Sequence, residues 1–237
     1  MQYKTELHLH TDLVSPCADL PYTESAERYL EAGYTTIVVT DHYSRPIVER
    51  EGRSWEESMD HFLSGYRAMK EYLGGRANVL LGCELRFDGS RNDYLIFGVT
   101  EEFLRQNPTL NRMSVPEFSA FARENGLLFV QAHPFRNSMT VVKPHFLDGI
   151  EVFNGHKGHD SRNFLAHAYA KHCGLIPTSG TDFHHPDSVI SGGILTDAPI
   201  TSIEQLVAVL KSRDYTLICE GPCAKDGDLH NIHASEF

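Results

Sequence analysis

The sequence lacks any long hydrophobic run and any excess of positive charge. No apolar stretch approaches the ~18 residues of a membrane span, and the chain opens on a polar segment rather than a secretion signal. Lysine and arginine number 21 against 32 aspartates and glutamates, which gives a formal net charge of −11. Such a chain is poorly suited to neutralising phosphate backbones, so we do not expect extended nucleic acid as a partner, although a short nucleotide could bind.

Cysteine is too sparse for a disulfide-stabilised fold. The five cysteines are odd in number and form no disulfide-dense pattern, so we expect reduced thiols and a cytoplasmic protein. Cys17 is most simply a small packed side chain rather than a redox-sensitive thiol. Two cysteines and two histidines near the end of the sequence are the residue types of a zinc finger, namely Cys219, Cys223, His230 and His233. The loop between the two pairs is too short for a zinc finger, so we do not predict a second zinc site.

Internal repeats, low-complexity tracts and linkers are also missing. A chain of 237 residues can bury a sizeable core, so we expect one domain over residues 1–237. Histidine, in contrast, is abundant, with 14 residues. Because neutral imidazole is the commonest metal ligand, this composition favours metal chemistry.

Short extended segments alternate with helical ones along the chain. The predicted helices have N-caps at Thr23, Ser54 and Ser114, and the last two have glutamate three residues later, as in a capping box. A last helix, strand and tail occupy 202–237. The alternation predicts parallel βα units and, with seven or eight strands, an α/β barrel. The predicted strands are 3–9, 34–40, 78–85, 94–99, 127–132, 149–153, 175–179 and 215–219.

Ligand-type side chains gather at the ends of these strands. His8 and His10 are two positions apart on the first strand, so they project from the same face. Since the carboxyl ends of barrel strands meet at one face, we expect all such groups to converge. Imidazole and carboxylate suit Zn²⁺, Mn²⁺ or Fe²⁺. The other strand-end groups are Asp41, His42, Glu84, His133, Glu151, Asp182 and His184.

The number of candidate ligands exceeds what one tetrahedral ion needs. We therefore expect two or three divalent ions, bridged by a carboxylate such as Glu84. Multinuclear centres activate water and stabilise both oxygens of a phosphoryl displacement. The sequence thus predicts hydrolysis of a phosphate ester by a metal-bridging hydroxide.

Six motifs between residues 8 and 184 resemble the PHP family, the polymerase and histidinol phosphatase domain. They follow the order and spacing of that family: HLH at 8–10, TDH at 40–42, CEL at 83–85, AHP at 132–134, GIEVFN at 149–154 and GTDFH at 180–184. The resemblance implies a single-domain, distorted (β/α)7 TIM-like barrel with two or three ions of zinc, manganese, iron or magnesium. It also implies phosphoesterase activity on a small phosphorylated metabolite or nucleotide.

The resemblance also implies a ligand set. Asp19 is the candidate for the acidic or histidine ligand that follows the first motif, with Asp12 as the alternative. Asp93 stands where many relatives carry another histidine, which leaves the number of ions open, and Glu151 is a less certain ligand. The implied ligands are His8, His10, Asp19, His42, Glu84, Asp93, His133, Asp182 and His184.

The reaction needs further groups around the ions. His184 or His185 would protonate the leaving alkoxide, and Asp41 would act beside the ions, most simply by orienting a ligand. Arg136 is predicted to contact the substrate phosphate, and a structural ion pair is its alternative role. Weaker candidates for contact with phosphate or substrate are Lys143, Arg86, His145, His156 and His159.

Two other functions stay open. A related barrel could hydrolyse amides, but that class generally uses a bridging modified lysine where this chain has Glu84. A noncatalytic, metal-stabilised binding module is the second alternative, and the nearly complete ligand set argues against it. No motif indicates the physiological substrate or the oligomeric state.

Overall fold

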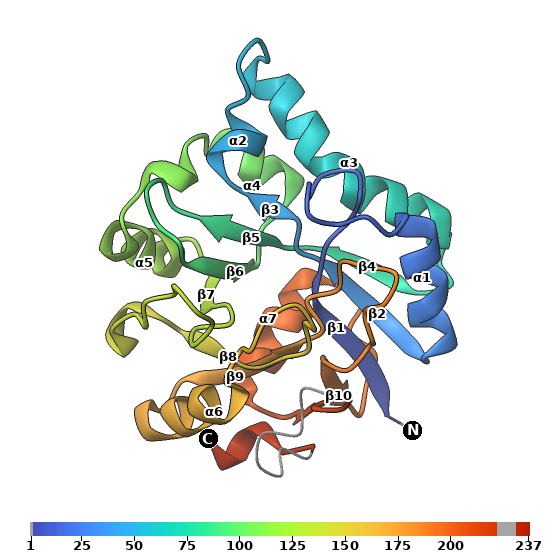
Figure 1. Ribbon diagram of the computed structural model, residues 1–237, viewed down its shortest axis with the longest axis vertical. Coiled ribbons are helices and arrows are strands. Elements are labelled where there is room, and N and C mark those ends of the chain that lie inside the picture. The colour runs from blue at the N-terminus through green and yellow to red at the C-terminus, as the bar shows by residue number, and fades with distance from the viewer. Residues whose placement is uncertain (1, 222–230) are drawn as a thin grey trace.

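The computed structural model describes residues 2–221 and 231–237, which form a mixed α/β fold with two sheets and helices packed around them (Figure 1). The first sheet has the strand order β11-β10-β1-β2-β4, and the second has the order β3-β5-β6-β7-β8-β9. The strands are β1 (Tyr3–Leu9), β2 (Tyr34–Val39), β3 (His42–Tyr43), β4 (Asn78–Leu81), β5 (Cys83–Arg86), β6 (Asp93–Phe97), β7 (Leu128–Gln131), β8 (Gly149–Asn154), β9 (Ile176–Gly180), β10 (Ile194–Thr196) and β11 (Thr216–Leu217).

The two sheets meet at two places. Strands β2 and β3 follow each other closely, as do β4 and β5, and the N–H of Gly82 donates to the carbonyl of Val39 at 2.9 Å across this break. On the other side the N–H of Asp182, beyond β9, donates to the carbonyl of His8 in β1 at 2.9 Å. These contacts bring the carboxyl ends of several strands together.

Strand direction agrees with the sequence prediction only in part. The pairs β1–β2, β2–β4, β7–β8 and β8–β9 are parallel, as expected. The prediction is wrong for β6, which runs antiparallel to both β5 and β7. The segment between β5 and β6 is a short hairpin connection, too short for the crossover helix that a parallel pair requires. Strand β10, antiparallel to β1, was not predicted.

The helices pack on the outside of the sheets, with α1 and α3 beside the first sheet and α6 against β8 (Figure 1). Both predicted capping boxes are confirmed, at Ser54 and Ser114. The predicted cap at Thr23 is wrong, because α1 begins at Tyr22, whose N–H donates to Asp12 Oδ1 at 2.8 Å. The helices are α1 (Tyr22–Glu31), α2 (Arg45–Val48), α3 (Trp55–Leu73), α4 (Glu101–Gln106), α5 (Val115–Glu124), α6 (Asn163–Cys173) and α7 (Ile203–Ser212).

Buried aromatic rings fix the strands of the second sheet. The ring of Phe129 on β7 lies 4.7 Å from that of Tyr94 on β6 and 4.9 Å from that of Phe118 on α5. Such pairs contribute ~0.5–1.5 kcal/mol each beyond the burial of their area. They fix β7 against β6 and α5 just before His133, which follows β7. Among the described residues, no helix is both long and apolar enough to span a bilayer.

Candidate metal centre

Two imidazole nitrogens face each other in the buried interior, at the end of β1. Nε2 of His8 lies 3.1 Å from Nε2 of His10. Nδ1 of His8 is 2.8 Å from Glu151 Oε1, and Nδ1 of His10 is 3.1 Å from the hydroxyl of Ser15, which itself donates to Asp41. Each Nδ1 therefore carries the hydrogen that its acceptor needs, so that in the neutral form of each ring Nε2 presents a lone pair. Two lone pairs at this distance repel unless a cation or a proton lies between them.

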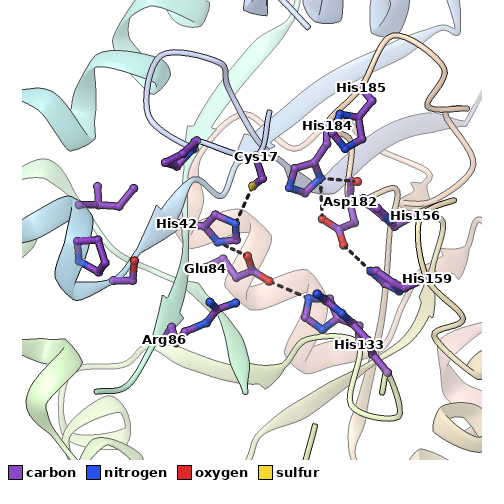
Figure 2. A pocket seen from close by; sticks show the side chains of 15 residues that line it. Cys17, His42, Glu84, Arg86, His133, His156, His159, Asp182, His184 and His185 are labelled. Carbon is purple, nitrogen blue, oxygen red and sulfur yellow. Dashed lines mark hydrogen bonds and ion pairs between the residues drawn. The ribbon is translucent and has the colours of Figure 1, made fainter. Parts of the chain in front are cut away.

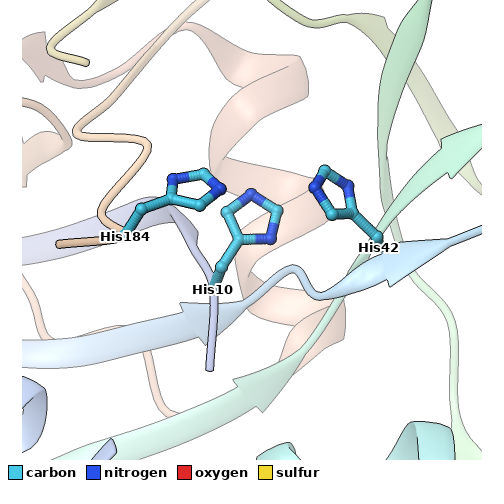
Figure 3. A group of neighbouring side chains, drawn as sticks. All are labelled: His10, His42 and His184. Carbon is cyan, nitrogen blue, oxygen red and sulfur yellow. The ribbon is translucent and has the colours of Figure 1, made fainter. Parts of the chain in front are cut away.

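A second group of imidazoles surrounds His10. Its ring lies between those of His42 and His184, with centroid separations of 4.4 and 4.2 Å (Figure 3). One ring nitrogen from each of these three residues lies within 4.8 Å of the other two. Nδ1 of His184 donates to the main-chain carbonyl of Asp182 at 2.9 Å, so its Nε2 is also free to act as a ligand.

Glu84 lies between the two groups. Its Oε1 is 3.0 Å from His133 Nε2 and 3.4 Å from His8 Nε2, and its Oε2 is 2.6 Å from His42 Nδ1. In two further triads one ligand atom of each residue also lies within 4.8 Å of the other two, namely in His8–Glu84–His133 and in His8–His10–Asp182. Glu84 thus lies within reach of histidines from both groups, and its bridging role stays a prediction.

These donor atoms fit divalent ions. A Zn–N bond of ~2.0–2.1 Å places two nitrogen ligands of a tetrahedral ion ~3.3 Å apart. The nitrogens of His8 and His10 are 3.1 Å apart, and each is 3.4 Å from Asp182 Oδ1. All three residues are buried, so the cluster has the composition and spacing of a metal site without rearrangement.

The charges of the site favour a bound cation. Burial lowers the pKa of His8, but the carboxylates of Asp182, Glu151 and Glu84 outweigh it and hold that pKa well above its usual range. Burial raises the pKa of Glu84, yet His42 and His8 hold it well below its usual range. Glu84 therefore stays ionised and attracts positive charge, which a metal ion would supply by displacing protons.

His10 differs from its neighbours. Burial lowers its pKa, and the nearby His184 and His42 lower it further, so that the pKa lies well below the usual range. A neutral imidazole is the form that coordinates a metal. His10 is thus in the form that binds a metal, and it belongs both to the group with His42 and His184 and to the group with His8 and Asp182.

Two candidate ligands have strained backbone conformations. His133 has φ = +27° and Asp182 has φ = +54°, values that cost ~1–3 kcal/mol for residues other than glycine. Hydrogen bonds hold both in place: the N–H of His133 donates to Glu151 Oε2 at 2.8 Å, and Nδ2 of Asn154 donates to Glu151 Oε2 and Asp182 Oδ2 at 3.0 Å each. Strain of this kind is concentrated where function requires a fixed side-chain direction.

Some implied ligands lie outside these groups. Asp19 is exposed and its Oδ1 lies 2.8 Å from Nδ1 of His185, while Asp12 caps α1, so neither joins the three groups. Asp93 makes a two-point ion pair with Arg86 at 2.6 and 2.7 Å and is 3.9 Å from His133 Nε2. This geometry does not support a ligand role for Asp12 or Asp19, and it leaves Asp93 at the edge of the centre.

A cavity of about 470 Å³ opens over the cluster, within the size range of small-molecule sites (Figure 2). Arg136 and His185 line it, whereas Lys143 is exposed and does not. Arg86 also lines it but is held by Asp93. Asp41 is buried away from the cavity, where its carboxylate accepts hydrogen bonds from Thr11 and Ser15.

Loop histidines also reach the cavity. His156 and His159 line it with rings stacked 4.5 Å apart, and Nε2 of His159 is 3.7 Å from Asp182 Oδ2. His145, the third loop candidate, is exposed, packs on Phe146 and does not line the cavity.

The prediction that Cys17 is a packed side chain is wrong. It is exposed at the cavity, and its Sγ lies 3.1 Å from Nε2 of His42 (Figure 2). Burial raises the pKa of the thiol, but hydrogen bonds with His184 and His42 bring it down to about 6. The sequence signal for this position was the short distance of Cys17 from the first motif, seven residues after His10. Two of the four residues considered for a second zinc site, Cys223 and His230, lie outside the described residues.

Buried Glu6 is a further residue that no sequence pattern singled out. Its carboxylate accepts hydrogen bonds from the N–H of His8 at 2.9 Å, from the N–H and hydroxyl of Thr181 at 2.9 and 2.6 Å, and from the hydroxyl of Tyr29 at 2.7 Å. It thereby ties the ligand-bearing end of β1 to the segment that carries Asp182.

Comparisons with known proteins agree with this geometry. The family model described as PHP domain matches residues 6–217. No curated protein matches the sequence significantly.

Several solved structures share the fold. One is a two-domain Bacteroides vulgatus protein containing a predicted PHP-like metal-dependent phosphoesterase, with a TM-score of 0.63 and 17% identity. The match covers 92% of this chain and 64% of the Bacteroides protein, so this chain spans less than two thirds of that protein's length. PsfC from Pseudomonas syringae has a TM-score of 0.63 and 15% identity, covering 87% of this chain and 88% of PsfC. An amidohydrolase from Chromobacterium violaceum, with bound sulfate and no metal, has a TM-score of 0.52 and 16% identity over 87% of this chain and 96% of that one.

Proposed function

Because this chain belongs to the PHP domain family, we propose that it is a metal-dependent hydrolase of phosphate esters, acting on a small phosphorylated metabolite or nucleotide. One observation carries the proposal: the Nε2 atoms of His8 and His10 face each other at 3.1 Å among the carboxylates of Glu84, Glu151 and Asp182, an arrangement that a divalent cation satisfies. We further propose two or three ions of zinc, manganese or iron, with magnesium as an alternative, and a distorted (β/α)7 barrel as the underlying architecture.

Some residues of the site would bind the ions, and others would orient those ligands. Divalent ions, when bound, polarise phosphoryl oxygens and activate water for attack on phosphorus. Glu151 fixes the ring of His8, and Asp41 fixes the Thr11–Ser15 turn that contacts His10. The ions would be held by His8, His10, His42, Glu84, His133, Asp182 and His184.

His185 is the better candidate for the general acid. His184 uses Nδ1 on the carbonyl of Asp182 and belongs to a ligand group, so it is committed to the ions. His185 lines the cavity outside those groups, and Asp19 contacts its Nδ1 at 2.8 Å. With Nδ1 facing this carboxylate, Nε2 is the ring nitrogen from which a proton can pass to the leaving alkoxide.

Arg136 is the better candidate for the phosphate contact. It lines the cavity, and in the described part of the chain its guanidinium makes no hydrogen bond or ion pair with another side chain. Arg86 is already neutralised by Asp93. A planar guanidinium can bind two phosphate oxygens at once, which favours Arg136 for orienting the substrate.

Amide hydrolysis is the alternative, and the similarity to an amidohydrolase concerns the fold alone at 16% identity. Among the residues that the structure describes, no lysine lines the cavity above the cluster, and Glu84 occupies the central position between the ligand groups. This donor set favours the phosphoesterase. A noncatalytic module would have no need of the substrate-sized cavity that lies over the ligands.

The test is turnover of p-nitrophenyl phosphate, followed by phosphate release from a panel of small phosphorylated metabolites. We expect a chelator to abolish turnover and Mn²⁺ to restore it, and His10→Ala to remain inactive at every metal concentration. Hydrolysis that survives both the chelator and His10→Ala, or no hydrolysis of any phosphate ester by the metal-loaded protein, would contradict the proposal.

A further inference from the structure

We infer that Cys17 is a thiolate ligand of the ion held by His10, His42 and His184. The inference rests on the proposed metal centre and assigns to it a sulfur donor that the sequence did not indicate. Cys17 lies in the loop between β1 and α1 and reaches the cavity from the side of His42 (Figure 2).

The geometry around His42 directs a ligand atom toward the sulfur. Nδ1 of His42 faces Glu84 Oε2 at 2.6 Å, and Nε2 faces Cys17 Sγ at 3.1 Å. Nδ1 faces the carboxylate, so Nε2 is the ring nitrogen that an ion lying between His42 and the sulfur would use. Zn–S and Zn–N bonds of ~2.3 and ~2.0 Å would place these two atoms ~3.5 Å apart on a tetrahedral ion, so a small movement of the thiol suffices.

The group also needs a further donor. Its three described members are imidazoles, one short of the four ligands of a closed tetrahedral site. The two nearby loop carboxylates are used elsewhere, Asp12 at the start of α1 and Asp19 against His185. The thiol of Cys17, which interacts with both His42 and His184, is the donor that the loop offers to this group.

A sulfur ligand changes which ion the position prefers. The thiol gives up its proton to solvent when the ion binds, and the thiolate brings negative charge to three neutral imidazoles. Thiolates favour zinc and similar ions over manganese and magnesium, which prefer oxygen. We therefore expect this position to select zinc, while the positions near Glu84 and Asp182 accept harder ions.

Cobalt substitution tests the assignment directly. Co²⁺ bound to a thiolate gives an intense sulfur-to-cobalt charge-transfer band in the near ultraviolet, which nitrogen and oxygen ligands do not give. We expect the band in the wild-type protein and in Cys173→Ser, a matched control on α6, and its loss in Cys17→Ser. Elemental analysis after zinc loading and gel filtration should show about one ion per chain fewer in Cys17→Ser than in the control.

A Cys17→Asp variant separates a ligand role from a structural one. A carboxylate can replace the thiolate, so this variant should regain the zinc content without regaining the band, with a far-ultraviolet circular dichroism spectrum like that of the wild type. Cobalt bound to the wild type without the band, or unchanged zinc content in Cys17→Ser, would overturn the sulfur ligand and leave the phosphoesterase proposal standing. Failure of the wild type to bind any divalent ion would overturn both.

Discussion

Glu151 contacts two candidate ligands at once: its Oε1 lies 2.8 Å from Nδ1 of His8, and its Oε2 accepts the main-chain N–H of His133 at 2.8 Å. The sequence left the role of Glu151 open between ligand and non-ligand. Its contacts support a positioning role, because both oxygens are occupied by groups that orient the centre.

Replacement of this carboxylate should weaken metal binding. Glu151→Gln keeps the size of the side chain but turns one acceptor into a donor, so either His8 or the backbone at His133 loses its partner. We expect zinc affinity to fall ~10–100-fold in a competition titration with a chromogenic chelator. Glu124→Gln, at an exposed position at the end of α5, is the control. Equal affinity in the two variants would show that Glu151 does not orient the centre.

Gly180 allows β9 to pass close to His8. A Cβ at this position would lie 2.4 Å from the Cβ of His8 and 2.9 Å from Glu151 Oε1, closer than real contacts allow. Gly180→Ala must therefore displace β1 or β9, and overpacking of this kind typically costs ~1–3 kcal/mol. We expect a lower free energy of unfolding in urea and a lower metal content. Unchanged values of both would mean that the strands adjust without disturbing the ligands.

Much of this arrangement could be predicted from the sequence. Alternation on a strand places His8 and His10 on one face, and polar residues after apolar runs correctly predicted that Glu84, His133 and Asp182 would converge. Local patterns could not predict contacts between distant segments. The bonds from Thr181 to Glu6 span 175 positions, and they align β1 with the segment after β9.

The loop after β1 shows the same limit. Asp12, Cys17 and Asp19 all follow the first motif, and only the path of the loop decides which of them faces His42. The reversed direction of β6 likewise depends on a short hairpin rather than on its apolar pattern, which suits either direction.

Asp41 makes stability depend on pH in the metal-free protein. Burial raises its pKa from 3.8 to about 6, although hydrogen bonds from Thr11 and Ser15 lower it in part. A raised carboxyl pKa contributes stability that is present below the unfolded pKa and is lost as the pH rises through the folded pKa. The shift corresponds to about 2 kcal/mol between about pH 4 and pH 7.

Asp41→Asn removes this titration while keeping the side-chain shape. The unfolding free energy of the wild type relative to that of Asp41→Asn should fall by about 2 kcal/mol from pH 4 to pH 7. Urea titrations of both proteins in the presence of a chelator measure the difference. A difference that is independent of pH would show that the Asp41 carboxyl titrates alike in the folded and unfolded states.

Substitutions of Arg136 and Lys143 distinguish a direct contact with the substrate phosphate from a general effect of positive charge. Both follow β7, but only Arg136 lines the cavity, while Lys143 is exposed away from it. A charge-assisted hydrogen bond to substrate contributes ~1.5–3 kcal/mol, so Arg136→Gln should lower kcat/KM ~10–150-fold at constant metal content. Lys143→Gln removes the same charge and should leave kcat/KM unchanged. Arg136→Lys should recover only part of the loss, because an ammonium cannot bind two oxygens in the planar manner of a guanidinium. If Arg136→Gln and Lys143→Gln were equally active on the best substrate of the phosphate-release panel, the role of Arg136 would be structural.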